Sequence, residues 1–197
     1  MPPPDSSPQV VALGLAAGSA ERCLVMAARR GDEQAIRDFY RAFSEPVSNL
    51  VNSLVGDPVQ AQDVLQNVFF KAFRGLPGFR FESCLMTWIY RIARNECRNH
   101  IRARGLPPLP LAAVVGSRAE VDGRIPTEDE AAGRAALRDV VMQLPFKMRE
   151  VIILKYVEDL SYKEMSRILG CPPGTVASRL ARALVELETR LRAAGEA

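Results

Sequence analysis

Histidine and cysteine are scarce in this 197-residue sequence, which has one histidine and four cysteines. His100 has no neighbouring residues in a pattern for nucleophilic or acid–base catalysis, so we expect a protein that is not an enzyme. Cys97 and His100 have a C-x-x-H spacing and Cys84 precedes them, but zinc needs a fourth ligand and Cys97 fits a buried stripe. We therefore expect no metal site and no cofactor.

Disulfide and membrane signals are missing as well. The cysteines at positions 23, 84, 97 and 171 lie far apart in apolar helical contexts, which favours a reducing cytoplasm over a disulfide framework. No apolar run approaches the roughly 20 residues that span a bilayer. The short apolar stretch at 10–17 follows Asp5 rather than a basic cluster, so a secretory signal is not expected. We expect a cytoplasmic protein without membrane insertion.

Alternation typical of strands does not occur, whereas apolar residues recur at three- and four-residue spacing along most of the chain. This pattern predicts an all-α protein with two small helical domains joined by a flexible linker. The expected tail is rich in Pro, Ser, Gly and Ala, and residues that break helices recur in the expected linker. The expected divisions are a flexible tail at 1–22, a first domain at 23–105, a linker at 106–130 and a second domain at 131–194.

Several residues predict where helices in the first domain begin and end. Pro46 predicts a break or a first helical turn. Asp57 followed by Pro58 predicts the start of a helix that ends near Gly75. Ser83 is expected to cap a long helix over residues 85–102.

The predicted helix at 85–102 carries an arginine row that only Glu96 opposes. The row consists of Arg91, Arg94, Arg98 and Arg102. Like charges at this spacing repel, so the row needs a polyanion or acidic neighbours elsewhere in the fold. Trp88, Tyr90 and Asn95 stand among the arginines, a combination that suits single-stranded bases and phosphates. The alternative is a solvated helix whose Trp88 and Tyr90 belong partly to the core.

The second domain ends in a predicted helix-turn-helix. Ser161 and Glu164 form a capping box, Gly170 is expected to end that short helix, and a last helix runs to about residue 193. Polar side chains remain on the last helix after its core face is assigned, and they suit a DNA major groove. They are Thr175, Ser178, Arg179 and Arg182. A plain helical hairpin with solvated arginines is the alternative.

Two sets of motifs resemble the extracytoplasmic-function sigma factors of the sigma-70 family. The first set resembles conserved region 2: GDEQA at 31–35, Asp57, AQDVLQNVFFKAF at 61–73, and TWIYRIARN at 87–95. The second set resembles region 4: REV at 149–151, LSYKE at 160–164, and LGCPPGTVASRL at 169–180. Together they cover most of residues 23–193 in the order and spacing of that family.

The resemblance implies an alternative sigma factor that binds core RNA polymerase and directs promoter-specific initiation. The clamp of the largest polymerase subunit would bind Asp63, Gln66, Asn67 and Phe70. Of the two adjacent rings, we separately expect Phe69 to be buried and Phe70 to be exposed. The melted −10 element would contact Phe79, Arg80, Ser83, Trp88, Tyr90, Arg91, Arg94, Asn95 and Arg98. The −35 duplex would contact Lys163, Thr175, Ser178, Arg179 and Arg182. The flap of the second-largest subunit and an anti-sigma factor would be further partners.

Some positions depart from the family pattern. Gln62 and Asn67 stand where members often carry Glu, and Ala177 and Leu184 stand where basic residues are usual. The missing basic residues keep one alternative open, a decoy that sequesters an anti-sigma factor without binding promoters. A stand-alone helix-turn-helix regulator would leave residues 23–104 unexplained.

Replacing Arg182 with alanine tests the expected −35 contact. We expect Arg182→Ala to weaken promoter binding about equally for different sequences, because a phosphate contact carries no base information. The slope of log affinity against log salt should fall by about one unit. A salt titration of promoter binding by the polymerase complex measures it, and an unchanged slope would contradict the assignment.

Overall fold

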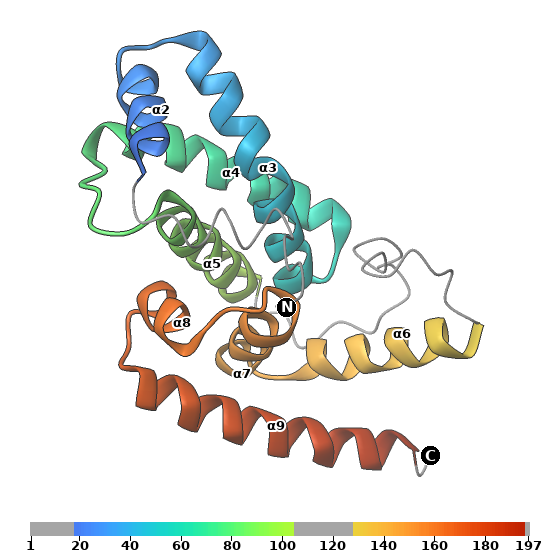
Figure 1. The fold of residues 1–197 in the computed structure, drawn as a ribbon. Helices are drawn as coiled ribbons and strands as arrows, with labels where there is room; N and C mark the ends of the chain where they lie inside the picture. The colour runs from blue at the N-terminus through green and yellow to red at the C-terminus, as the bar shows by residue number, and fades with distance from the viewer. Residues whose placement is uncertain (1–17, 105–127, 196–197) are drawn as a thin grey trace, which may run out of the picture.

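The computed structural model describes residues 18–104 and 128–195, and within these ranges it contains helices and no strand. The first range, called the N-terminal unit, contains α2 (Ser19–Arg29), α3 (Glu33–Val55), α4 (Pro58–Gly75), the short 3-10 helix η1 (Leu76–Gly78) and α5 (Leu85–Ala103). The second, called the C-terminal unit, contains α6 (Glu128–Gln143), α7 (Phe146–Ile152), the π-helical turn η2 (Ile153–Val157), α8 (Tyr162–Leu169) and α9 (Pro173–Gly195). The expected all-α class with two helical units is confirmed (Figure 1).

The helix boundaries show which local signals the chain uses. Asp57 caps α4 by accepting bonds from the backbone N–H groups of Val59 and Gln60. Ser161 and Glu164 form the expected capping box on α8, and Gly170 ends that helix with a left-handed φ of 67°. These starts and ends were predictable because each depends on residues within one turn of the boundary.

Two predicted boundaries are wrong, and tertiary contacts explain both. Pro46 does not break the chain but lies inside the continuous helix α3, where Phe43, Val47 and Leu50 on the same helix are buried. Their packing offsets the roughly 3 kcal/mol that proline costs inside a helix. Ser83 does not cap α5, because Cys84 occupies the N-cap position and makes no side-chain cap bond.

The first described helix begins earlier than expected, at Ser19 rather than at residue 23. Helix α6 begins at Glu128. In α2, the Glu21 carboxylate accepts a bond from the backbone N–H of Leu85, which ties this first turn to the start of α5. Residues 1–17 of the expected tail and 105–127, which include most of the expected linker, lie outside the described residues.

The core of the N-terminal unit is built from α3, α4 and α5. Phe39, Leu50, Leu54 and Ile89 have no exposed surface, and Cys97 is fully buried among them. Burial raises the pKa of the Cys97 thiol far above its usual range. The same buried cluster continues into the C-terminal unit through Leu144, Leu154, Met165, Ile168 and Val176.

The two units pack against each other (Figure 1). Helix α8 lies against α5, and both α7 and η2 lie against α3. Arg149 of α7 is 6% exposed and lies at this junction. Its guanidinium donates to the carbonyl of Leu54, 2.9 Å away near the end of α3, and to the carbonyls of Met142 and Leu144. Burial lowers the pKa of Arg149 to about 10, which still leaves it charged near pH 7.

The variant Arg149→Leu tests how much this junction contributes to the free energy of unfolding. We expect it to lose about 3 kcal/mol of unfolding free energy, because three buried carbonyls lose a charged donor. Urea denaturation measures the loss, and Lys147→Leu, at an exposed position of the same helix, is the matched control with an expected change within about 0.5 kcal/mol. Equal losses in the two variants would contradict a specific role for Arg149.

Candidate nucleic-acid interface

One face of α4 presents the four residues expected to contact a large partner. Asp63, Gln66, Asn67 and Phe70 are all exposed, and their spacing places them along one side of the helix. Phe70 is 59% exposed whereas Phe69 is 6% exposed, so the expected difference between the two rings is confirmed. An exposed phenylalanine flanked by polar groups is typical of a protein–protein contact.

A pocket of about 360 Å³ lies where the segment 76–84, which we call the pocket loop, meets the first turns of α5. Its walls combine rings, hydroxyls and guanidinium groups. The lining residues are Gly78, Phe79, Arg80, Glu82, Ser83, Thr87, Trp88, Arg91 and Arg167. Five of the residues expected to contact the melted −10 element, Phe79, Arg80, Ser83, Trp88 and Arg91, therefore come together in one hollow.

Aromatic packing shapes the floor of the pocket. The Phe79 ring is buried, with its centroid 5.3 Å from that of Trp88 and 5.0 Å from that of Phe81. Phe79 therefore supports the pocket from beneath, and the half-buried Trp88 presents the accessible aromatic surface. Arg80 and Arg91 are exposed at the rim. An aromatic floor with a cationic rim suits an unstacked base and its phosphate.

The arginine row of α5 is only partly exposed. Arg91, Asn95 and Arg98 are exposed, whereas the Arg94 side chain is 12% exposed. Glu96, the acid expected to oppose the row, instead forms an ion pair with Lys71 of α4 at 2.6 Å. Glu96 therefore does not neutralise the row.

Tyr90 points into the junction between the units. It is 1% exposed, and its hydroxyl donates a 2.6 Å hydrogen bond to the Glu158 carboxylate of the C-terminal unit. In this conformation its ring cannot stack on a base, although the sequence suggested that role. Tyr90 therefore matches the alternative stated from the sequence, in which its ring belongs to the core.

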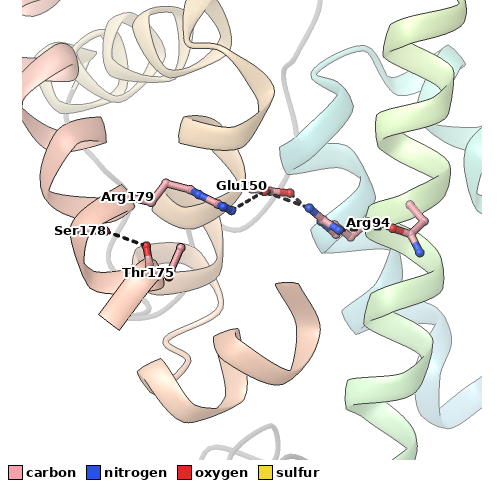
Figure 2. Close-up of polar contacts among 6 residues, drawn as sticks. Arg94, Glu150, Thr175, Ser178 and Arg179 are labelled. Atoms are coloured by element: carbon pink, nitrogen blue, oxygen red, sulfur yellow. Dashed lines mark hydrogen bonds and ion pairs between the residues drawn. The ribbon is translucent and has the colours of Figure 1, made fainter. Parts of the chain in front are cut away.

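A single buried carboxylate connects the two expected DNA-binding surfaces. Glu150 of α7 has no exposed surface, and Arg94 donates to its two oxygens at 2.6 and 3.1 Å. Arg179 of α9 donates to the same carboxylate at 3.3 Å. Figure 2 shows Arg94 and Arg179 approaching Glu150 from opposite sides, one from each unit. A buried carboxylate without these partners would be strongly unfavourable.

The remaining helix-turn-helix residues face solvent. Lys163, Thr175, Ser178 and Arg182 are exposed, and Arg179 is the member of the set that turns inward to Glu150. The Ser178 hydroxyl donates to the Thr175 carbonyl at 3.1 Å (Figure 2), and Arg182 donates to the Ser178 carbonyl at 3.3 Å. The exposed side chains form a surface that a duplex can approach.

Sequence reasoning missed the residues that act between the units. Arg167 of α8 lines the pocket of the N-terminal unit, and Glu150 and Glu158 hold Arg94 and Tyr90. Nothing within one helix signals these contacts, because they depend on how the two units pack.

His100, the only histidine in the sequence, makes a polar contact with α4. His100 contacts the Gln60 side chain at 3.0 Å, and desolvation lowers its pKa, with a further lowering by Arg104. No group of three or more potential metal ligands gathers among the residues that the structure describes. None of the described helices is both long and apolar enough to span a bilayer.

Two family models match the sequence. The model for sigma-70 region 2 matches residues 39–106, and the model for sigma-70 region 4 matches residues 134–187. The first match covers α4, the pocket loop and α5, and the second covers most of the C-terminal unit.

Curated proteins and solved structures of the same kind are similar over most of the chain. The RNA polymerase sigma-H factor of Pseudomonas aeruginosa is 37% identical over 86% of this chain and 92% of its own length. The ECF RNA polymerase sigma-E factor of Escherichia coli K12 is 32% identical over 87% of this chain and 94% of its own. A Bartonella quintana sigma factor, RpoE, solved with the anti-sigma factor NepR, has a TM-score of 0.61 and 25% identity, covering 79% of this chain and 98% of that one.

The variant Arg94→Gln tests whether the Glu150 contact holds the units together. We expect the radius of gyration of the free protein to rise, because the bidentate bond from α5 is lost while Arg179 still pairs with Glu150. Small-angle X-ray scattering measures it. Arg98→Gln removes the same charge from an exposed position one turn away and should leave the radius unchanged. Identical radii for both variants would contradict the role of Arg94.

Proposed function

The chain belongs to the extracytoplasmic-function sigma factors of the sigma-70 family, and we propose that its two helical units divide promoter recognition between them. As a member of this non-catalytic family, it binds core RNA polymerase and directs promoter-specific transcription initiation. In the proposed division, the N-terminal unit binds the clamp and captures the melted −10 element. The C-terminal unit contacts the −35 duplex. The site of action is the cytoplasm, where RNA polymerase works.

The observation that carries this proposal is the pocket between the pocket loop and α5. Five residues expected at a −10 site line one hollow, and they include two aromatic rings and two arginines. A base leaving the duplex costs a few kcal/mol of unstacking, and stacking on an aromatic ring returns roughly 1–3 kcal/mol. Phosphate contacts from Arg91 and Arg98 offset the rest. This is what strand capture requires chemically.

The packing of the two units suggests an order of events. The α4 face that would bind the polymerase is exposed, whereas Tyr90 and Arg94 are held by the C-terminal unit and Arg167 lines the pocket. We propose that the chain binds core polymerase through α4 first, and that separation of the units then frees the −10 surface. Glu150 keeps Arg179 as a partner when Arg94 leaves, so separation does not strand a wholly unpaired buried charge.

In the C-terminal unit, some of the residues expected at the −35 duplex are exposed and one is held inside the protein. Lys163, Thr175, Ser178 and Arg182 are free to contact the −35 duplex, and we assign them that role. Arg179 lies against Glu150 and supports the recognition helix from behind. This unit would also contact the flap of the second-largest polymerase subunit. Control by an anti-sigma factor is part of the proposal, since a similar sigma factor was solved in complex with one.

Run-off transcription with purified core polymerase on a promoter library tests the proposed function. We expect the double variant Arg91→Gln/Arg98→Gln to reduce strand opening at least about tenfold on duplex promoters while core binding is kept, because both side chains would contact phosphates. Permanganate reactivity of the −10 region measures strand opening. Arg94 is left intact, since it also binds Glu150.

The control Arg37→Gln/Arg41→Gln removes two exposed arginines from another helix and should open promoters normally. Normal strand opening by the Arg91/Arg98 variant would contradict the proposed role of the arginine row. A wild-type chain that binds an anti-sigma factor but neither binds core polymerase nor directs specific starts would support the decoy alternative.

A further inference from the structure

Helix α2 contacts the pocket loop at several points, although it lies outside the residues matched by the region 2 family model. Arg29 of α2 donates through Nε to the carbonyl of Leu76 at 3.2 Å, at the start of the loop. A second guanidinium nitrogen of Arg29 donates to the carbonyl of Phe79, which is itself in the pocket lining. One side chain therefore joins two turns of the loop.

The contacts continue along the loop to its far end. Phe81 has a φ of 58°, which a non-glycine residue adopts only at an energetic cost. Its ring packs against two cations of α2, with the guanidinium carbons of Arg22 and Arg29 at 4.9 and 5.4 Å from its centroid. Where the loop ends, the Glu21 carboxylate accepts from the backbone N–H of Leu85 and supplies the cap that α5 otherwise lacks.

These contacts leave α2 outside the pocket itself. Glu21, Arg22 and Arg29 are not among the pocket-lining residues, so they act on the pocket through the loop backbone and the Phe81 ring. The buried Val25 anchors α2 to the unit, which separates attachment of the helix from its polar contacts with the loop. A loop with a strained residue and little regular structure needs such external contacts to keep one conformation.

We propose that α2 is a positioning element for −10 recognition, and that Arg29 is its central positioning residue. Arg29 presets the pocket loop so that Arg80 and Ser83 face the captured base before DNA arrives. Preordering removes the entropy that the loop would otherwise lose on binding. The inference rests on the proposed function, because it concerns the same pocket.

Arginine is the side chain that this position requires. A planar guanidinium can donate to two carbonyls and lie over a ring at once, whereas a lysine ammonium is a point charge that cannot reproduce this geometry. Arg29→Lys should therefore restore only part of the function lost in Arg29→Ala.

The experiment compares Arg29→Ala with Arg30→Ala in the full chain bound to core polymerase. Arg30 is the exposed neighbour at the end of the same helix, so both variants lose one charge at nearly the same place. The promoter is the strongest start site from the run-off library, used alongside versions with single substitutions in the −10 element. Initiation rates give the discrimination ratio between them, and polymerase binding and thermal unfolding are measured in parallel.

We expect Arg29→Ala to initiate about tenfold more slowly on the intact promoter and to lower the discrimination ratio, with polymerase affinity kept. Arg29→Lys should be intermediate and Arg30→Ala normal. An unchanged discrimination ratio in Arg29→Ala, whether initiation is normal or falls equally on every promoter, would overturn the inference. If Arg29→Ala behaves normally while the Arg91/Arg98 variant fails to open promoters, this inference fails and the proposed function stands.

Discussion

One buried carboxylate links the two described units. Glu150 lies between Arg94 of the N-terminal unit and Arg179 of the C-terminal unit, and it has no exposed surface. A carboxylate in such a place is tolerable only while positive charge and hydrogen bonds surround it, since its desolvation costs several kcal/mol. The same contact that satisfies Glu150 withdraws Arg94 from the α5 surface. The Glu150 contact thus links the packing of the two units to the accessibility of Arg94.

The other contacts between the units differ in what they would cost to break. Arg149 binds carbonyls on both sides of the junction, and Tyr90 donates to Glu158. The Leu54 carbonyl lies near the end of α3, where backbone acceptors can be taken over by water once exposed. Apolar residues of both units also share one buried core, so separation of the units exposes apolar surface as well as polar groups. A surface that replaces this junction must therefore cover apolar side chains and supply hydrogen-bond partners.

Much of the fold could be predicted from the sequence because its signals are local. Helical periodicity, Asp57 with Pro58, and the capping box at Ser161 all act within one turn, and each is confirmed. The misplaced boundaries have a different origin. Pro46 remains helical because its neighbours are buried by other helices, and α5 takes its cap from Glu21, 64 residues earlier. The pocket could be anticipated, since its residues adjoin in sequence, but the roles of Glu150 and Arg167 could not, since packing between units decides them.

The chemistry of Arg94 suggests why closure and promoter binding exclude each other. Its guanidinium contacts both Glu150 oxygens, the bidentate geometry that also fits a phosphate. The Arg94 side chain is only 12% exposed in this arrangement, so its remaining N–H donors reach a DNA phosphate only after the units separate. Arg91 and Arg98, on the same row but exposed, carry no such conflict and can attract DNA before the units separate. The row would then work in sequence, with its exposed members making the first contacts and Arg94 joining after it leaves Glu150.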